Sequence, residues 1–412
     1  MSSDSVDQLT QARAGIYNAS HPPLMAWVWH WTDRILPGPL GMILLQNALF
    51  WGGVALLAAL ALPSPWCGAA VLAVGLLPPA AGLLGTVWKD VQMGAAFAAA
   101  FALLCAARVT GRKIALLPAA LLLFYGTSMR HNAVTAALPL CCLGAWVARP
   151  RRGRAFVLLA GVFCAGALAL ASAAAARALV KGRAASPLQA QQFLLHDLVA
   201  ISLAEHADYL PDYLHRGPAP VSVAQIRAKY RPESSDPLFF SEPPRLRPAA
   251  APADVDDLRM HWARAVARHP IDYLLHRWEL TRALAGLERQ VCYPHHFQID
   301  PNPFGIVLAQ TVANRLAMDV LHAVDNSALF RGWIYVALLA AVVIVNLARA
   351  PAPRWASTAL AASGLSYFLP YVVFAPTCDF RYQWWTVIAT LLVPLALALE
   401  RRGRAAEPLA AG

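Results

Sequence analysis

Three short polar groups interrupt the apolar stretches of this chain, and each contains a cation that could bind phosphate. The groups are Lys89-Asp90, Arg130-His131-Asn132 and Asp379-Phe380-Arg381-Tyr382. Arginine offers a fork of donors that suits phosphate, lysine is a compact charge, and histidine titrates near neutral pH. Because an arginine near the middle of a membrane costs about 2.5–3.5 kcal/mol, Arg130 must lie at a membrane face or line a wet cavity.

Two carboxylates near the start of the chain could act together with these cations. Asp4 and Asp7 are three residues apart, so a helix places both on one face, and His21 follows them. Such a carboxylate could take a proton from an acceptor hydroxyl or bind a divalent cation through oxygen. The structural alternative is an exposed acidic terminus in which Asp4 caps a helix.

The cationic groups also have purely structural interpretations. Lys89 could be an interfacial lysine with Asp90 favourably placed at a helix N-terminus, and Arg130 could belong to an ordinary polar turn. The aromatic residues of the last group are most simply an interfacial belt, formed by Tyr382, Trp384 and Trp385. A functional interpretation therefore requires that the three groups share one membrane face.

The composition is that of a polytopic helical membrane protein. Of the 412 residues, 58% are hydrophobic and only 14% are charged, and the mean hydropathy is +0.48. The net charge of +11 comes from short basic clusters between apolar runs, which is typical of cytoplasmic loops and not of a nucleic-acid-binding protein. We therefore expect the lipid bilayer as a partner, and no nucleic acid.

Nine apolar runs predict an all-α fold with about nine membrane spans. The runs are Leu40–Leu62, Ala69–Val87, Met93–Ala107, Ile114–Tyr125, Ala133–Val147, Ala155–Ala176, Trp333–Leu347, Ala356–Phe374 and Trp385–Leu399. Taken alternately, the turns fall into two sets, and four of the five turns in one set are rich in arginine. By the positive-inside rule that set is cytoplasmic, so Asp4, Asp7, Lys89, Arg130 and Arg381 share the extracytoplasmic face. The four turns contain Arg108, Arg112 and Lys113; Arg149, Arg151, Arg152 and Arg154; Arg349 and Arg354; and Arg401, Arg402 and Arg404.

The chain divides into three parts. Residues 1–180 hold the N-terminal spans and the external loop with the acidic pair, and residues 331–412 hold the last spans. Residues 181–330 are too long for an ordinary connection and predict a mainly helical extracytoplasmic domain. An external N-terminus before nine spans also predicts a further helix upstream of this sequence.

The long segment has its own local signals. Ala190–Leu203 and Asp254–Leu287 have helical apolar periodicity, with Leu258, Trp262, Ala265 and Val266 on one stripe, and Pro270 should break or restart the second helix. Cys292 and Cys378 lie outside the apolar runs, and they could pair if their loops face an oxidising compartment.

The N-terminal motifs resemble the first external loop of the membrane-embedded GT-C glycosyltransferases. The motifs are Asp4-x-x-Asp7-Gln8, Gly15-x-Tyr17 and His21-Pro22-Pro23-Leu24. The superfamily includes protein O-mannosyltransferase-like and lipid A aminoarabinose transferase-like enzymes, in which this loop follows a first transmembrane helix and carries an essential acidic residue. A resemblance to bacterial GT-C-like proteins extends over most of the chain, through Trp88-Lys89-Asp90, Arg130-His131-Asn132, the stretch from His269-Pro270 to Arg277, and Asp379–Tyr382.

This resemblance implies an enzyme of the bacterial inner membrane that transfers a sugar from a polyprenyl-phosphate-linked donor. The acceptor would be an extracytoplasmic lipid, polysaccharide or protein. Asp7, with Asp4 as the second choice, would act as base or metal ligand, while Lys89, Arg130 and Arg381 would contact the donor phosphate. The supporting residues would be Asp90, His131, Asn132 and His21. A divalent cation at Asp4 and Asp7 is the one candidate cofactor.

Two other functions are compatible with the composition. A transporter or flippase of lipid-linked saccharides should carry polar or charged residues at mid-span, whereas these runs consist largely of alanine, leucine and valine. A non-catalytic envelope assembly protein would use residues 181–330 to bind partners. It would tolerate replacement of Asp7 and Arg130.

Overall fold

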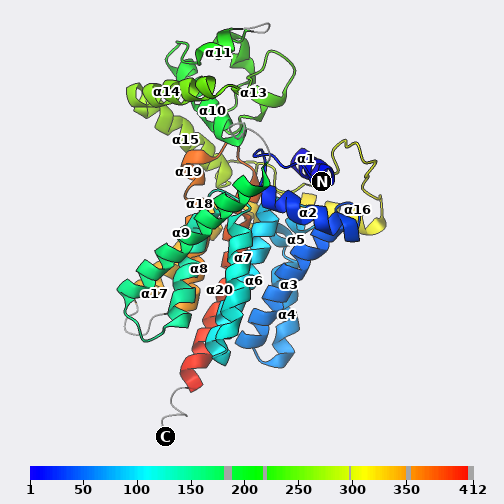
Figure 1. The fold of residues 1–412 in the computed structure, drawn as a ribbon, viewed down its shortest axis with the longest axis vertical. Helices are drawn as coiled ribbons and strands as arrows, with labels where there is room; N and C mark the ends of the chain where they lie inside the picture. Colours follow the sequence, from blue (N-terminus) through cyan, green and yellow to red (C-terminus); the bar gives the residue numbers. More distant parts are fainter. Residues whose placement is uncertain (181–187, 217–219, 297, 349–353, 407–412) are drawn as a thin grey trace.

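The fold is all-helical, as the apolar runs predict. The computed structural model describes residues 1–180, 188–216, 220–296, 298–348 and 354–406. Helix makes up 74% of the structure, and the described residues contain no β-strand. Figure 1 shows a bundle of long helices with a smaller helical domain at one end. Arg349 and the first residues of the predicted 181–330 domain lie outside the described residues.

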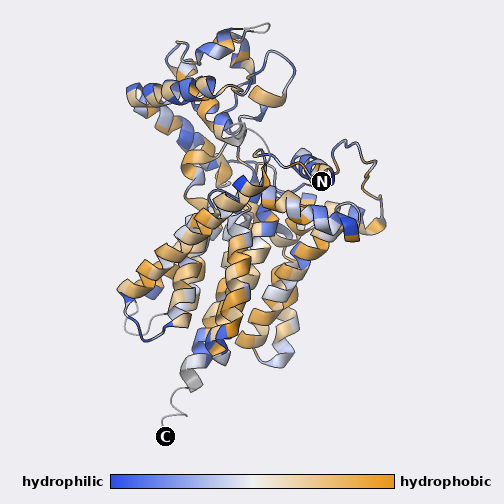
Figure 2. Cartoon of the chain, in the orientation of Figure 1, coloured by the Kyte–Doolittle hydropathy of each residue, from blue (hydrophilic) through white to orange (hydrophobic). Residues whose placement is uncertain are grey.

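The bundle is built from the apolar helices, which Figure 2 shows as a largely hydrophobic layer. Its helices are α3 (Leu40–Ala61), α4 (Ser64–Gly75), α5 (Pro78–Leu84), α6 (Lys89–Thr110), α7 (Leu116–Thr127), α8 (Ala133–Ala148), α9 (Arg154–Leu179), α17 (Gly332–Ala348), α18 (Trp355–Phe368), α19 (Tyr371–Phe374) and α20 (Trp384–Ala406). The described residues also contain four short 3₁₀ turns: η1 (Lys113–Ala115), η2 (Arg227–Lys229), η3 (Ala328–Phe330) and η4 (Phe380–Gln383).

Five helical segments in the described part of the chain are long and apolar enough to cross a membrane. They are Leu40–Ala61, Lys89–Thr110, Arg154–Leu179, Trp355–Phe374 and Phe380–Gly403. The pair α4 and α5, bent by 71°, would add a sixth if it is one span. The chain is therefore a membrane protein.

Close helix packing in the bundle depends on small residues. At Gly53 of α3, an added Cβ would lie 2.8 Å from the backbone of Ala99 in α6, so any side chain would push the two helices apart. The neighbouring Gly52 has open space where its Cβ would be. Small residues at helix crossings are the usual means by which membrane helices approach closely.

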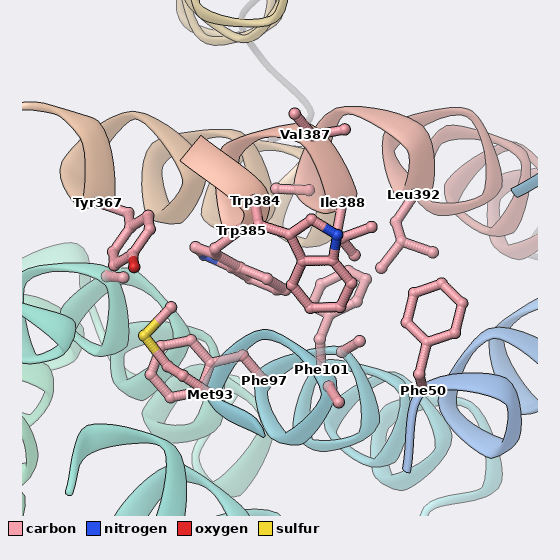
Figure 3. Packing of buried hydrophobic residues seen from close by; sticks show 14 of the residues in the cluster. Phe50, Met93, Phe97, Phe101, Tyr367, Trp384, Trp385, Val387, Ile388 and Leu392 are labelled. Carbon is pink, nitrogen blue, oxygen red and sulfur yellow. The ribbon is translucent and has the colours of Figure 1, made fainter. Parts of the chain in front are cut away.

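Two adjacent tryptophans at the start of α20 pack between helices of the bundle (Figure 3). Trp384 and Trp385 are both fully buried, and the Trp385 ring packs edge-on against Phe97 with ring centroids 5.5 Å apart. Gly94 provides the space, since a Cβ there would lie 2.6 Å from the Trp384 ring. The interpretation of these residues as an interfacial belt is therefore wrong, and Tyr382 is buried as well. The reason is that α20 packs against α3, α6 and α18, so its aromatic side chains face protein.

Three further helices lie where the bundle meets the domain (Figure 1). They are α1 (Ser3–Ala14), α2 (Pro23–Ile35) and α16 (Val312–Val324). Helix α1 ends because Gly15 adopts a left-handed conformation with φ of 65°, and α2 starts with Pro23 in its first turn. The Ser5 hydroxyl donates to the carbonyl of Val87 at 2.7 Å, which holds α1 beside the start of α6.

The domain has a hydrophobic core of its own. Its helices are α10 (Leu188–Ala204), α11 (Asp212–His215), α12 (Val223–Ile226), α13 (Asp236–Phe240), α14 (Pro252–Arg268) and α15 (Pro270–Leu284). The predicted stripe on α14 packs into this core, and Pro270 begins α15 directly after α14 ends, as predicted. Leu284, Leu321 and Phe330 belong to the bundle core instead, so the part of residues 181–330 with a separate core ends near α15.

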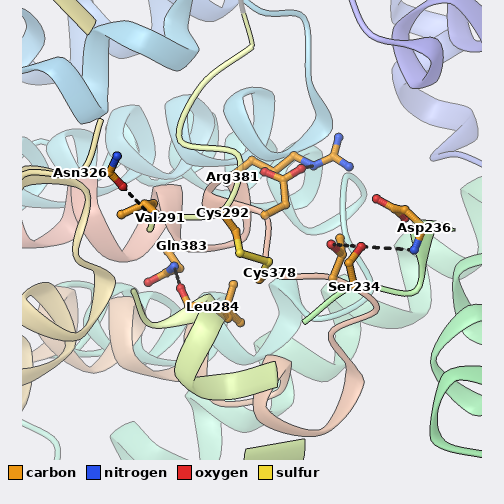
Figure 4. Close-up of a disulfide and its surroundings, with 11 residues drawn as sticks. Ser234, Asp236, Leu284, Val291, Cys292, Asn326, Cys378, Arg381 and Gln383 are labelled. Carbon is orange, nitrogen blue, oxygen red and sulfur yellow. Dashed lines mark hydrogen bonds and ion pairs between the residues drawn. A yellow bond between two sulfur atoms is a disulfide. The ribbon is translucent and has the colours of Figure 1, made fainter. Parts of the chain in front are cut away.

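A short segment, residues 375–378, connects the domain to the bundle. Its hydrogen bonds with the domain run from Arg277 Nη1 to the Ala375 carbonyl (2.8 Å), from Ser235 N to the Pro376 carbonyl (3.0 Å), from Thr377 Oγ1 to Ser234 Oγ (2.9 Å) and from Cys378 N to the Glu233 carbonyl (3.0 Å). Cys378 also forms a disulfide with Cys292 (Figure 4). Cys292 and Cys378, whose pairing the sequence allowed but did not establish, are therefore joined.

Candidate functional site

Asp4, in the first turn of α1, lies between two cations that come from distant parts of the chain. Its Oδ2 is 3.7 Å from Nζ of Lys89, at the start of α6, and 3.2 Å from Nη1 of Arg381, in η4. Burial opposes ionisation of this carboxyl, but Lys89 and Arg381, helped by His21, outweigh burial and hold the pKa of Asp4 well below its usual range. Asp4 is therefore an anion at physiological pH.

The third predicted cation, Arg130, is paired with Asp90. Arg130 Nε donates to Asp90 Oδ1 at 2.7 Å, and Nη2 lies 2.6 Å from the same oxygen. The Tyr367 hydroxyl donates to this oxygen as well, at 3.0 Å. The guanidinium of Arg130 is 4.7 Å from the centre of the Tyr382 ring, and that of Arg381 is 5.4 Å from the same ring. The two arginines thus share one aromatic neighbour, and Asp90 positions the first of them.

Asp379, which is not among the predicted site residues, holds Arg381 in place. Its Oδ1 accepts the backbone N–H of Arg381 at 3.0 Å, and its Oδ2 lies 2.8 Å from Nε of the same residue. Burial raises the pKa of Asp379 to about 6, although Arg381 favours the charged form. The only sequence signal for Asp379 was its position two residues before Arg381.

A pocket of about 180 Å³ lies beside Asp4 and Arg381. Its walls also include Trp88, Asp379 and His295. The Arg381 guanidinium stacks on the Trp88 ring at 4.6 Å from the ring centre, which fixes the orientation of the cation. The pocket is smaller than the roughly 300–1,000 Å³ of typical small-molecule sites. It has room for a single small polar group.

Asp7 faces a different set of neighbours from Asp4. Its Oδ2 accepts from Gln11 Nε2 at 2.7 Å and lies 3.5 Å from His21 Nε2, and its side chain is 45% exposed. Burial and the charge of Lys89 together lower the pKa of His21 to about 4, so this imidazole is neutral near pH 7. Asp4, the second choice from the sequence, is thus the carboxylate that lies next to the cations, whereas Asp7, the first choice, contacts Gln11 and His21.

The remaining predicted residues lie near Arg130. Asn132 donates from Nδ2 to the Tyr367 carbonyl at 3.3 Å, which fixes the turn before α8, whereas His131 is exposed. Asp4 and Asp7 belong to neither of the two sets of clustered metal-ligand side chains found in the described part of the chain.

Comparisons with known proteins return no match: no family model fits the sequence, and no curated protein or solved structure is significantly similar to it.

Proposed function

We propose that this membrane protein is a glycosyltransferase of the GT-C type, which moves a sugar from a polyprenyl-phosphate-linked donor to an extracytoplasmic acceptor. The observation that carries the proposal is the Asp4 carboxylate, held between Lys89 and Arg381 at one end of an apolar helix bundle. A carboxylate beside two phosphate-binding cations combines a base for the acceptor with a site for the leaving group.

In this proposal Lys89 and Arg381 bind the donor phosphate, and Asp4 receives the proton of the acceptor hydroxyl. The hydroxyl oxygen forms a bond to the anomeric carbon while the bond from that carbon to the phosphate oxygen breaks. The lipid phosphate leaves with the electron pair of that bond. When the phosphate becomes the counter-ion of both cations, Asp4 loses part of their stabilisation and becomes a stronger base.

The other charged groups have supporting roles in the same scheme. Asp379 orients Arg381 through both of its oxygens, and Asp90 orients Arg130, which adds positive charge near the phosphate. We assign the role of base to Asp4 and not to Asp7, because Asp4 lines the pocket. Asp7 would then act through its contact with the neutral His21.

We propose further that nine spans cross a bacterial inner membrane, with the site and the domain on the extracytoplasmic side. The bent pair α4 and α5 would make one span, and three shorter apolar helices, Lys113–Thr127, Ala133–Ala148 and Gly332–Ala348, would cross with the help of their flanking residues. Helices α6, α8 and α20 all begin near the site and run towards arginine-rich ends, which supports this orientation. A disulfide near the site supports an oxidising compartment.

Complementation of a deletion strain tests the proposal. The full-length gene would be supplied as wild type, Asp4→Asn, Asp7→Asn or Asp256→Asn, and the surface glycans compared by mass spectrometry at matched membrane levels of the protein. Asp256 is the control, because it pairs with Arg259 at the surface of the domain, where the side chains are 75% and 63% exposed. We expect Asp4→Asn to abolish one defined sugar, Asp7→Asn to reduce it and Asp256→Asn to leave it unchanged.

A different result would point to one of the other functions. If deletion changes the glycans but Asp4→Asn does not, the catalytic assignment is wrong. If whole glycans built on one lipid carrier disappear, instead of one sugar residue being missing from otherwise intact glycans, the protein is a flippase or an assembly protein.

A further inference from the structure

Two histidines and an aspartate converge at one edge of the site region. His295 lies in the segment after α15, His322 in the last turn of α16, and Asp325 directly after that helix. His295 Nε2 is 2.7 Å from Asp325 Oδ1, and His322 Nδ1 is 3.2 Å from Asp325 Oδ2. The two imidazole rings meet edge to face with centroids 4.9 Å apart. The potential ligand atoms of all three side chains lie within 4.8 Å of one another.

These separations are close to those of ligands around one zinc ion. With bonds of about 2.0–2.1 Å in a tetrahedron, neighbouring ligand atoms are about 3.3 Å apart. Small side-chain shifts would bring the observed distances to this value. Two imidazoles and one carboxylate form a donor set that favours Zn²⁺ and related transition metals over Mg²⁺ or Ca²⁺, which prefer oxygen ligands.

We propose that His295, His322 and Asp325 bind one Zn²⁺ ion. The fourth position would face solvent, because the His322 side chain is 56% exposed. The ion would join the segment that contains His295 to the end of α16. His295 also lines the pocket beside Asp4 and Arg381, so the ion would stabilise one wall of that pocket. The inference concerns metal binding alone and does not depend on the proposed transferase activity.

A second cluster of potential ligands, Glu205, His269 and Asp272, is the natural competitor. Both ring nitrogens of His269 are already engaged there, Nε2 with the Tyr209 hydroxyl at 2.8 Å and Nδ1 with Glu205 at 3.2 Å. This cluster also has one imidazole and two carboxylates, a donor set that favours zinc less than two imidazoles and one carboxylate. This cluster therefore supplies the matched control for the experiment.

The test measures zinc in the full-length protein, purified in detergent without a histidine tag. After chelator treatment and dialysis against micromolar ZnCl₂, elemental analysis should find one zinc per chain in the wild type and in His269→Ala. His322→Ala and Asp325→Asn should lower zinc content at least tenfold. Zinc at about a hundredfold excess over its Kd should raise the melting temperature of the wild type by about 3–4 °C, and that of the two variants by less than 1 °C.

Melting in the presence of chelator shows whether a variant is folded. His322 is mostly exposed, so without zinc both His322→Ala and the wild type should melt at nearly the same temperature. The proposal is overturned if the wild type binds no zinc, if both His322→Ala and Asp325→Asn retain it, or if His269→Ala abolishes it instead.

Discussion

Removing the charge of Asp90 while keeping its shape should destabilise the protein strongly, because it leaves Arg130 as a buried cation without a counter-ion. The Asp90 side chain is fully buried, and only 9% of the Arg130 side chain is exposed. Removing one partner of a buried pair typically costs about 3–5 kcal/mol. The entropy of unfolding grows with chain length, so for this protein that cost lowers the melting temperature of Asp90→Asn by about 4–6 °C.

A second variant distinguishes the cost of one unpaired buried charge from the contribution of the ion pair to stability. In Asp90→Asn/Arg130→Met both charges are gone, and no buried ion is left unpaired, so most of the lost stability should return. The control is Asp212→Asn, which breaks an ion pair between Asp212 and Arg216 whose side chains are 67% and 73% exposed. Exposed pairs contribute little, and this control should shift the melting temperature by less than about 1 °C.

Thermal unfolding in one detergent at pH 7, followed by far-ultraviolet circular dichroism, measures all three variants. The reasoning is refuted if Asp90→Asn melts within 1 °C of Asp212→Asn. It is also refuted if the double variant is as unstable as Asp90→Asn.

Three more outcomes follow from the packing, the disulfide and the protonation of the site, and the same melting assay checks them. Gly53→Ala should lower the melting temperature by several degrees because its Cβ would meet the α6 backbone, whereas Gly52→Ala, with open space around it, should have no such effect. Cys292→Ser or Cys378→Ser should cost about 2–5 kcal/mol, and alkylation of the wild type should label these two thiols only after reduction. The pKa of His21 falls from its ordinary 6.5 to about 4 in the folded protein. Between these pH values the unfolded chain binds a proton that the folded protein does not, so the contribution of His21 to the free energy of unfolding is complete above pH 6.5 and is lost as the pH falls towards 4. His21→Gln should therefore flatten the pH dependence of stability in that range, and an unchanged profile would contradict the neutral assignment.

The helices of the bundle could be predicted from sequence, because long apolar runs have few stable environments other than lipid or a helical core. The position of α20 within the bundle could not. Trp384 and Trp385 stand at the start of an apolar run, where interfacial aromatic residues are common. Their burial depends on Gly94, about 290 residues earlier, which leaves the space for the Trp384 ring. Residue spacing holds no information about such distant complementarity.

Some of the residues that meet at the site could be grouped from the sequence, but their contacts could not. Alternation of the turns assigns Lys89 and Arg381 to one membrane face, and in the structure both lie beside Asp4 of α1. The sequence favoured Asp7 over Asp4, but spacing cannot separate the two, because both lie on one face of α1. The choice follows from the hydrogen bond of Ser5 to the chain before α6, a contact across 82 residues. His322 and Asp325 had a recognisable helical spacing, but only folding brings His295 to them.

The segment of residues 375–378 couples movement of the domain to the position of the site residues that follow it. The carbonyls that Arg277 and Ser235 hold belong to the same short stretch of backbone that continues into Asp379 and Arg381. Any rotation of the domain about α15 therefore pulls directly on the residues that orient the Arg381 guanidinium. The disulfide to Cys292 anchors this stretch from a third direction and limits how far it can travel. A molecule that binds the domain could thus change the orientation of Arg381 through a connecting segment of only a few residues.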